Sequence, residues 1–266
     1  MRYALTFLLM ATVALGQGVW PKTATVVDGG HRYDFDTLGK RSVTPSADYG
    51  NMVLWQTFSY SDNSDADFYD LSTSGNDGSQ TTAASQPTWS SADGGVYDFD
   101  GVDDSIDLPS FTGISASFTV AAWIRSDLFS GVITVLDSRN DTAPNDGFYF
   151  GFIGSKVWNI VDAGASAGNT QSTTSLSTNQ WYHIASTWAG GNILVYVNGA
   201  DDNGSPTSLA GTLSITDAAA VGVNTSSGTD FFDGDLDDVR VYDAALTAAQ
   251  IGAIYTNTAP TYGISP

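Results

Sequence analysis

The sequence contains no cysteine, which excludes disulfide-stapled scaffolds and thiol chemistry. It also lacks glutamate: every acidic residue is aspartate, and with only nine lysines and arginines the 266-residue chain carries a formal net charge of −20. Such an acidic surface repels nucleic acid and anionic lipid, whereas it suits divalent cations, neutral glycans or a basic partner. Aspartate also fills turns and keeps proteins soluble, so part of this charge needs no ligand to explain it.

Long stretches of helix-forming residues are missing as well, whereas glycine, serine, threonine and asparagine are abundant. Hydrophobic residues make up 42% of the chain and aromatic residues 12%, which is enough to fill a core and excludes a disordered chain. This composition favours many short strands joined by tight turns. The length suits one large β-sandwich or two small domains.

The N-terminus has the pattern of an export signal. Arg2 supplies a positive charge, residues 4–15 form a short apolar stretch, and Ala14-Leu15-Gly16 resembles a small-residue cleavage site. We therefore predict a signal peptide over residues 1–16 and a secreted, extracellular protein, with a cell surface or a virion as further locations. The apolar stretch is short for a membrane span, so we expect no membrane insertion. The alternative is a strand or helix that stays in the protein.

The rest of the chain is expected to form three segments. Residues 17–48 form a polar N-terminal extension in which His31 to Phe35 could be one edge strand, residues 49–258 form the main domain, and residues 259–266 form a loose tail. The main domain is rich in predicted strands, and Asn198-Gly199 is a strong hairpin signal. Turn signals at intervals of roughly 8–12 residues predict a sandwich rather than alternating strands and helices.

One short helix is expected near the end of the main domain. Thr247 and Gln250 have the spacing of a capping box, with threonine as the N-cap. Leu246, Ile251 and Ile254 would form the apolar side of this helix.

A series of short motifs, in a fixed order over roughly residues 50–256, resembles laminin-G-like jelly-roll domains. Residues 70–78 resemble the family's D-x-S-G-N-x-x-D-G segment, and residues 99–106 resemble its F-D-G-x-D-D-x-V hairpin. Four later motifs follow in family order: Phe118-Thr-Val-Ala-Ala-Trp-Ile124, Trp181-Tyr-His-Ile-Ala185, Leu194-Val-Tyr-Val-Asn-Gly199 and Phe232-Asp-Gly-Asp-Leu-Asp-Asp-Val-Arg-Val-Tyr242. Together they identify the chain as a member of this family.

The resemblance implies an all-β fold: a two-sheet antiparallel jelly-roll sandwich of the concanavalin A-like type, with one short C-terminal helix. Each sheet would have about six or seven strands, and loops would surround a concave face. Pentraxins, legume lectins and laminarinase-type hydrolases are similar in architecture, so the fold leaves the function open.

Catalysis is not expected. Hydrolases of this fold use paired carboxylates, usually glutamates, and this chain has none. Asp235, Asp237 and Asp238 lie on one predicted strand, with Asp235 and Asp237 on the same face, but they match family positions that are not catalytic. His183 matches a structural position of the family, and with so few histidines no catalytic triad or zinc site can be assembled.

A structural calcium ion is the first metal site that the resemblance implies. An aspartate in such a D-D-V strand often binds calcium in related β-sandwich modules, and this carries over to Asp237 only. Asp237 is read in phase with the valines two and four positions further on, so we expect its carboxylate to be partly buried and to need a partner. The remaining oxygen ligands would come from Asn76, Asp77 and Gly78. The alternative is that Asp237 accepts backbone N–H bonds.

A second calcium or ligand site is expected at the rim. Asp103 and Asp104 fall where pentraxins have a calcium-binding pair, and Asp230 falls near a further pentraxin ligand, with Asn224 in the loop between. Such a site would bridge calcium to a hydroxyl or phosphate of a ligand. The alternative is that residues 100–103 form only a tight turn.

Aromatic side chains are the usual platform for a sugar ring. Three tryptophans match core positions of the family and are expected to pack in the interior: Trp123, Trp181 and Trp188. Trp89, Trp158 and Tyr149 match no clear core position. Trp158 lies in a short strand with polar flanks, so we expect it to be the surface platform.

We therefore predict a non-catalytic extracellular binding module for a carbohydrate or a glycosylated surface, with calcium as a structural or bridging ion. The alternative is a structural or adhesive assembly protein, such as a phage virion decoration, a fibre component or a surface filament subunit. Its partners would be copies of itself or other surface proteins. A third reading is an Asp-based polysaccharide-degrading enzyme.

Overall fold

The chain consists of two compact units that meet at Thr44 and Pro45. The computed structural model describes residues 24–28, 31–35, 41–44, 52–56, 67–72, 74–139, 146–164, 166–204 and 208–266. The signal peptide predicted over residues 1–16 lies outside the described residues.

The first unit contains a three-stranded antiparallel sheet of order β1-β2-β3. Its strands are β1 (Ala24–Asp28), β2 (His31–Phe35) and β3 (Arg41–Thr44). The expected strand at His31–Phe35 exists, but the expectation that it lies at an edge is wrong. It is the central strand, because β1 and β3 pair with its two sides.

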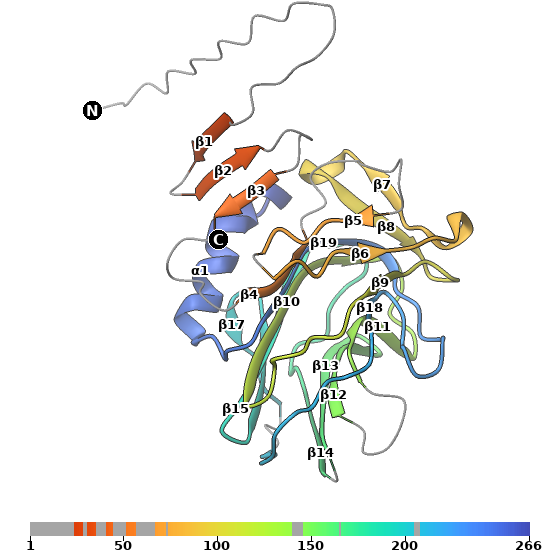
Figure 1. Cartoon of the computed structure of the whole chain (residues 1–266), viewed down its shortest axis with the longest axis vertical. Helices are drawn as coiled ribbons and strands as arrows, with labels where there is room; N and C mark the ends of the chain where they lie inside the picture. The colour runs from red at the N-terminus through yellow and green to blue at the C-terminus, as the bar shows by residue number, and fades with distance from the viewer. Residues whose placement is uncertain are drawn as a thin grey trace, which may run out of the picture. The chain divides into compact units, whose positions relative to one another are not determined.

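The second unit is a sandwich of two antiparallel sheets, as the family resemblance predicts (Figure 1). Each sheet has eight strands rather than six or seven, because strands of only two or three residues extend the edges. We call them the helix-side sheet, of order β17-β16-β15-β10-β19-β8-β7 with β4 also paired to β19, and the opposite sheet, of order β14-β13-β12-β11-β18-β9-β6-β5.

The strands of the helix-side sheet are β4 (Met52–Gln56), β7 (Thr88–Ser90), β8 (Val96–Asp100), β10 (Ser117–Ser126), β15 (Tyr182–Ala189), β16 (Asn192–Val197), β17 (Ala200–Asp201) and β19 (Asp233–Tyr242). The strands of the opposite sheet are β5 (Asp67–Phe68), β6 (Gly78–Ser79), β9 (Ile106–Leu108), β11 (Val132–Asp137), β12 (Asp146–Ile153), β13 (Lys156–Ala163), β14 (Ser166–Gln171) and β18 (Ala219–Val221). Three 3-10 turns complete the elements around the sheets: η2 (Ala83–Ser85), η3 (Ala92–Gly94) and η4 (Ala259–Tyr262).

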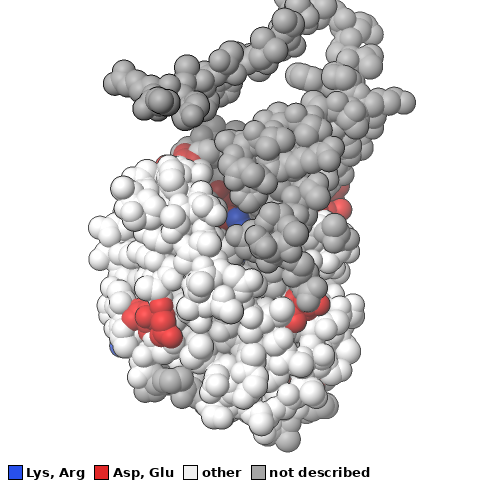
Figure 2. Space-filling view, turned by 90° about the vertical axis from the view of Figure 1, so that its left-hand side faces the viewer, with Lys and Arg blue, Asp and Glu red and all other residues white. Residues whose placement is uncertain are grey.

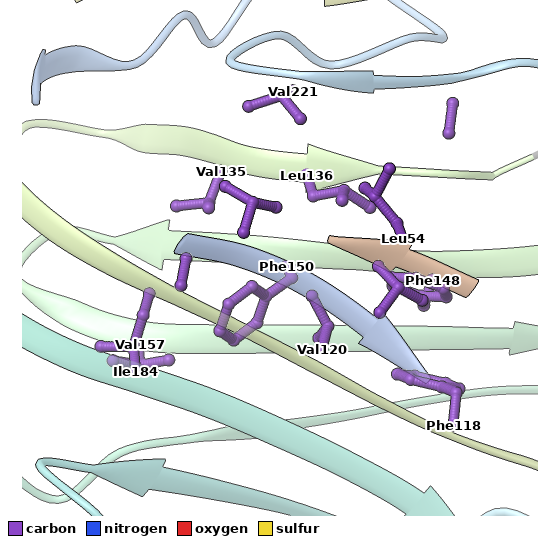
Figure 3. Packing of buried hydrophobic residues seen from close by; sticks show 14 of the residues in the cluster. Leu54, Phe118, Val120, Val135, Leu136, Phe148, Phe150, Val157, Ile184 and Val221 are labelled. Atoms are coloured by element: carbon purple, nitrogen blue, oxygen red, sulfur yellow. The ribbon is translucent and has the colours of Figure 1, made fainter. Parts of the chain in front are cut away.

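The core lies between the two sheets and is built from alternate residues of their strands (Figure 3). Phe148 and Phe150 of β12 point inward, and Phe118 of β10 stacks on Phe148 with ring centroids 4.2 Å apart. Trp188 is also buried in this core, as predicted. Because alternation sends every second residue inward, the residues between them are left for the outer faces of the sandwich.

A β-bulge in β19 changes the predicted phase of its aspartates. The pairing of β10 with β19 shifts register at this point, and Asp238 has a positive φ of 51°. Leu236 and Val239 both point into the core, so Asp237 and Asp238 both lie on the outer side between them. The expectation that Asp237 is in phase with the following valines is therefore wrong, because the bulge adds one residue that the period-two reading did not include.

The C-terminal helix α1 (Ala248–Thr258) begins with the predicted capping box: the Thr247 hydroxyl accepts the Gln250 N–H, and Gln250 Oε1 accepts the Thr247 N–H. Ile251 and Ile254 are buried, as expected. No helix of the described residues is long and apolar enough to cross a membrane.

The segment after α1 packs against the domain as far as Tyr262, so this part of the predicted tail is not loose. Ala259 is fully buried, and the Tyr262 ring stacks on Trp123 with centroids 4.2 Å apart. The Tyr262 hydroxyl donates a 2.7 Å hydrogen bond to Asp237 Oδ2. The expectation of a loose tail failed because this partnership joins residues far apart in the chain.

Candidate ligand-binding face

The two sheets differ in what lies on their outer faces. On the helix-side sheet, Trp123 and His183 lie beneath the C-terminal segment, with Tyr255 and Tyr262 as ring neighbours. Helix α1, the one α-helix of the described residues, contacts β17 and η4, neither of which belongs to the opposite sheet. The outer side of strands β11 to β14 is therefore the sheet surface that the C-terminal helix leaves open.

Trp158 lies on this open face. Along β13, buried and half-buried residues alternate without exception, so Trp158, Ile160 and Asp162 point outward while Val157 and Val161 enter the core. The indole is half-buried, and its Nε1 lies 3.5 Å from Asn169 Oδ1 on β14. The structure thus places Trp158 on the outer side of β13, and its role as a sugar platform stays a prediction.

Tyr149 forms the floor beside Trp158. Its ring lies 5.5 Å from the Trp158 ring, and its hydroxyl donates a 2.6 Å hydrogen bond to the carbonyl of Ile133. Gly151 makes this possible, because a Cβ there would lie 2.1 Å from the Ile133 carbonyl oxygen and 2.7 Å from the Tyr149 hydroxyl. Burial raises the pKa of Tyr149, so the phenol stays neutral, and the buried ring supports Trp158 from below.

Arg139 also lies over the Tyr149 ring. Its guanidinium carbon lies 5.0 Å from the ring centroid. Its Nε donates to Asp137 Oδ1 at 2.9 Å and its Nη2 to Asp137 Oδ2 at 3.0 Å. The Asp137 carboxylate is fully buried and also accepts the Thr225 N–H at 3.2 Å. A bidentate pair of this kind fixes the guanidinium in place and fully engages the carboxylate.

Asn224 and Asp230 lie in the loop at the rim of this face. Asn224 Nδ2 donates to Asp230 Oδ2 at 3.1 Å, and the Asp230 carbonyl accepts the Thr134 N–H of β11 at 2.9 Å. Thr225, next to Asn224, reaches Asp137. The structure therefore joins these two predicted residues to each other and connects their loop to the Tyr149 floor.

Asp103 and Asp104 belong to a separate acidic turn at the base of that loop. Together with Asp100 they hold carboxylate oxygens within 4.8 Å of one another. A Cβ at Gly222, near the start of the loop, would lie 3.2 Å from the Asp104 carbonyl oxygen. The turn also has internal bonds, since Asp100 Oδ1 accepts the N–H groups of Val102 and Asp103. Both the turn reading and a cation site are thus compatible with this geometry.

Burial and the neighbouring carboxylates raise the pKa of Asp104. Desolvation raises its pKa to about 6, and the charges of Asp100 and Asp103 act in the same direction, against one backbone hydrogen bond that lowers it. Three close carboxylates form a donor set that fits a hard divalent ion.

The other predicted calcium ligands lie in different places. Asp237 is buried on the helix-side sheet and accepts the Tyr262 hydroxyl and the Asp238 N–H. Asn76 donates to the Val53 carbonyl, and Asp77 Oδ1 accepts the Asp70 N–H. Gly78 lies in β6 of the opposite sheet. Asp237 thus has the protein partner that its burial requires.

The remaining carboxylates considered for catalysis are paired with arginine side chains. Asp235 Oδ2 accepts the Arg125 Nε–H at 2.7 Å, and the Asp238 carboxylate accepts Arg240 and the Trp55 indole N–H. His183 is buried, its Nδ1 has no described partner, and burial lowers its pKa to about 3. His183 is therefore a neutral packing residue, consistent with its structural reading.

The tryptophans expected in the core divide into two groups. Trp123 is fully buried, whereas Trp181 is only half-buried, stacks on Arg125 and donates to Asp93. Trp181 therefore lies outside the main core, and the expectation is wrong for this residue.

Sequence reasoning did not find the polar residues around the Tyr149 floor. Asp137 and Arg139 lie close together in the chain, but they meet Tyr149 and Asp162 only through strand pairing, and no short motif joins these groups. The one available signal was that Gly151 and Tyr149 alternate with the three phenylalanines of β12, which marks an outward aromatic beside a glycine.

Comparison with known proteins gives a family for the chain. The model of the Laminin_G_3 family, described as the concanavalin A-like lectin/glucanases superfamily, matches residues 100–252. No curated protein sequence matches.

Solved structures with a similar fold include several binding domains. Domain 4 of AbnA, an extracellular arabinanase from Geobacillus stearothermophilus solved with arabinotriose, has a TM-score of 0.60 and 17% identity, over 77% of this chain and 98% of that one. The binding domain of Paraclostridial Mosquitocidal Protein 1 has a TM-score of 0.60 and 16% identity, over 78% of this chain and 52% of that one. A structure of botulinum neurotoxin type C, whose cell entry depends on interaction with two ganglioside molecules, has a TM-score of 0.56 and 14% identity, over 78% of this chain and 51% of that one. The chain thus spans about half the length of these toxin structures.

Proposed function

The chain belongs to the concanavalin A-like lectin/glucanases superfamily, and on that premise we propose that it is a non-catalytic extracellular module that binds a glycan or a glycosylated surface. The observation that carries this proposal is the half-buried Trp158 on the open face of the opposite sheet, held against Tyr149. A ring held in this way offers a sugar a flat apolar surface at little entropic cost. The arabinotriose bound to AbnA domain 4 supports carbohydrate as the ligand class.

Binding rather than catalysis is favoured by the state of the carboxylates. A glycosidase needs one carboxyl to give a proton and a second to attack or to activate water. On the helix-side sheet, Asp235 and Asp238 are held by arginines and Asp237 by Tyr262. On the Trp158 face, Asp137 is fully buried beneath Arg139. These contacts give each of the four carboxylates a structural role.

Calcium remains part of the proposal. Asp100, Asp103 and Asp104 would hold the ion, which would neutralise the acidic turn and stiffen the base of the Asn224–Asp230 loop. The loop in turn contacts Asp137 through Thr225. Calcium would thus act on the glycan face indirectly, as a structural ion.

The test is a pull-down of the full chain on immobilised polysaccharides, in calcium and in EDTA, with Trp158→Ala and Trp89→Ala compared. We expect binding that Trp158→Ala reduces at least roughly tenfold. Trp89→Ala is the matched control, because it removes an indole from β7 of the other sheet. Loss of binding in EDTA would make calcium necessary for the site. Absence of binding in both conditions would contradict the proposal and favour an assembly protein.

A further inference from the structure

The charges around Trp158 are mostly negative. Four aspartates have charge interactions with Arg139, with Tyr149 or with Asp162: Asp137, Asp146, Asp162 and Asp230. Two cations lie on the same outer side: Arg139, over the Tyr149 ring, and Lys156, two residues before Trp158 at the start of β13. Figure 2 shows a different side of the molecule, the one on the left in Figure 1, where red patches also outnumber blue ones on a mostly uncharged surface.

The positive charge of Arg139 is already neutralised. Arg139 donates one hydrogen bond to each carboxylate oxygen of Asp137. Asp162 adds a second negative charge nearby. The remaining Nη1 has no described partner and can donate a hydrogen bond to a hydroxyl without adding net charge to the site. Asp162 is itself partly desolvated, and burial together with Asp137 and Asp146 raises its pKa. An anionic group on a ligand would therefore be repelled by aspartates that are already partly desolvated.

We propose that the Trp158 face selects neutral glycans and rejects glycans with carboxylate or sulfate groups. This inference rests on the proposed function and specifies its ligand class. One sugar of a neutral oligosaccharide would lie on Trp158, and the hydroxyls of this sugar and its neighbours along β13 would accept from Arg139 and Lys156 and donate to Asp162, so no ionic contact would be needed. Hydroxyl groups match a site that offers both donors and acceptors, whereas an anionic group can only accept.

The experiment uses a matched pair made from one glycan. The full chain is tested against arabinan, galactomannan, xyloglucan, polygalacturonate, alginate and chondroitin sulfate, and the neutral glycan that is retained best is then oxidised at its primary hydroxyls to uronate. We expect the oxidised form to bind roughly tenfold more weakly or worse at low salt, and the difference to shrink at high salt.

Two variants connect the result to this face. Asp162→Asn should narrow the difference in affinity between the neutral and oxidised forms severalfold, because it removes one repelling charge from the outer side of β13, the side that carries Trp158. Asp67→Asn is the matched control: it makes the same charge change at an exposed residue of β5, at the far edge of the same sheet, and should leave the difference unchanged.

The outcomes are separable. Equal or tighter binding of an acidic glycan, especially if Lys156→Gln abolishes it, would overturn the neutral-glycan inference while the carbohydrate-binding function stands. Failure to bind any member of the panel would instead overturn the proposed function itself, and the inference with it.

Discussion

At the scale of single residues, the three arginines described in the second unit share one environment. Each forms an ion pair with aspartate and lies over an aromatic ring: Arg125 with Asp93, Asp235 and Trp181, Arg139 with Asp137 and Tyr149, and Arg240 with Asp238 and Trp55. Their positive charges are thus neutralised by aspartates of the same chain. The chain therefore presents its net charge of −20 to ligands with little local compensation.

Gly151 is the residue on which the Tyr149 floor depends. Gly151→Ala should lower the free energy of unfolding by about 1–3 kcal/mol, because the new Cβ would overlap the Ile133 carbonyl and displace the Tyr149 hydroxyl. Urea unfolding measures this. Gly252→Ala is the matched control in α1, where the Cβ meets only the Gly199 carbonyl oxygen at 3.5 Å, and it should stabilise by about 1 kcal/mol. Equal effects of the two changes would contradict the described floor.

Asp104 gives a pH prediction with a defined sign. Its folded-state pKa of about 6 lies above the ordinary 3.8, so the folded state holds the proton more tightly. In EDTA, stability should therefore fall as pH rises from about 4 to 6 and then level off as far as this group is concerned. Asp104→Asn should show a smaller fall, because the amide keeps the acceptor for the Asp100 N–H without the charge.

Calcium should act on the same residue. At pH 7 the ion should raise the melting temperature of the wild-type chain and have less effect on Asp104→Asn, as differential scanning calorimetry would show. An identical calcium response in both proteins would remove the acidic turn as the binding site.

At the scale of elements, the C-terminal segment closes the outer face of the helix-side sheet. Tyr262→Phe should destabilise the protein by about 1–3 kcal/mol, because it leaves the buried Asp237 carboxylate without its hydroxyl donor. Tyr255→Phe is the control, since its ring also stacks near Trp123 and no hydrogen bond of its hydroxyl is described. If chemical denaturation gives the same midpoint for both variants, the Tyr262–Asp237 bond contributes nothing.

The elements also show how far the sequence determines the fold. Local signals sufficed for the capping box at Thr247, the hairpin at Asn198-Gly199 and the alternating strands, because each depends on neighbouring residues. The bulge at Asp238 escaped prediction, since an inserted residue leaves no mark on a period-two pattern. The polar residues around Trp158 in the sequence were enough to predict that its side chain points outward.

The site as a whole was less predictable than its platform. Arg139 and Asp137 gain their positions from Tyr149 on the paired strand and from Thr225, some 90 residues further along the chain. Asn224 and Asp230 were predicted to act together and do form a hydrogen bond, but the acidic turn at Asp103 and Asp104 forms its own group with Asp100. Long-range pairings of this kind require the topology, which a motif does not contain.

At the scale of the whole molecule, the sandwich has two outer faces with different roles. The helix-side face is filled by aromatic rings under α1 and η4, and the opposite face presents Trp158 among polar residues. Binding should therefore change the environment of one face only. The fold alone leaves the function open, because the matching superfamily includes both lectins and glucanases.

The most direct test of the central claim, that glycan binds on the Trp158 face, is an NMR titration of the indole N–H signals with the neutral oligosaccharide derived from the best-retained polysaccharide. Trp158→Phe identifies the Trp158 signal among those of the seven tryptophans. We expect that signal to shift on titration while the signals of Trp123 and Trp89 stay in place. Shifts confined to other tryptophans, with Trp158 unchanged, would contradict the assignment of the binding site to this face.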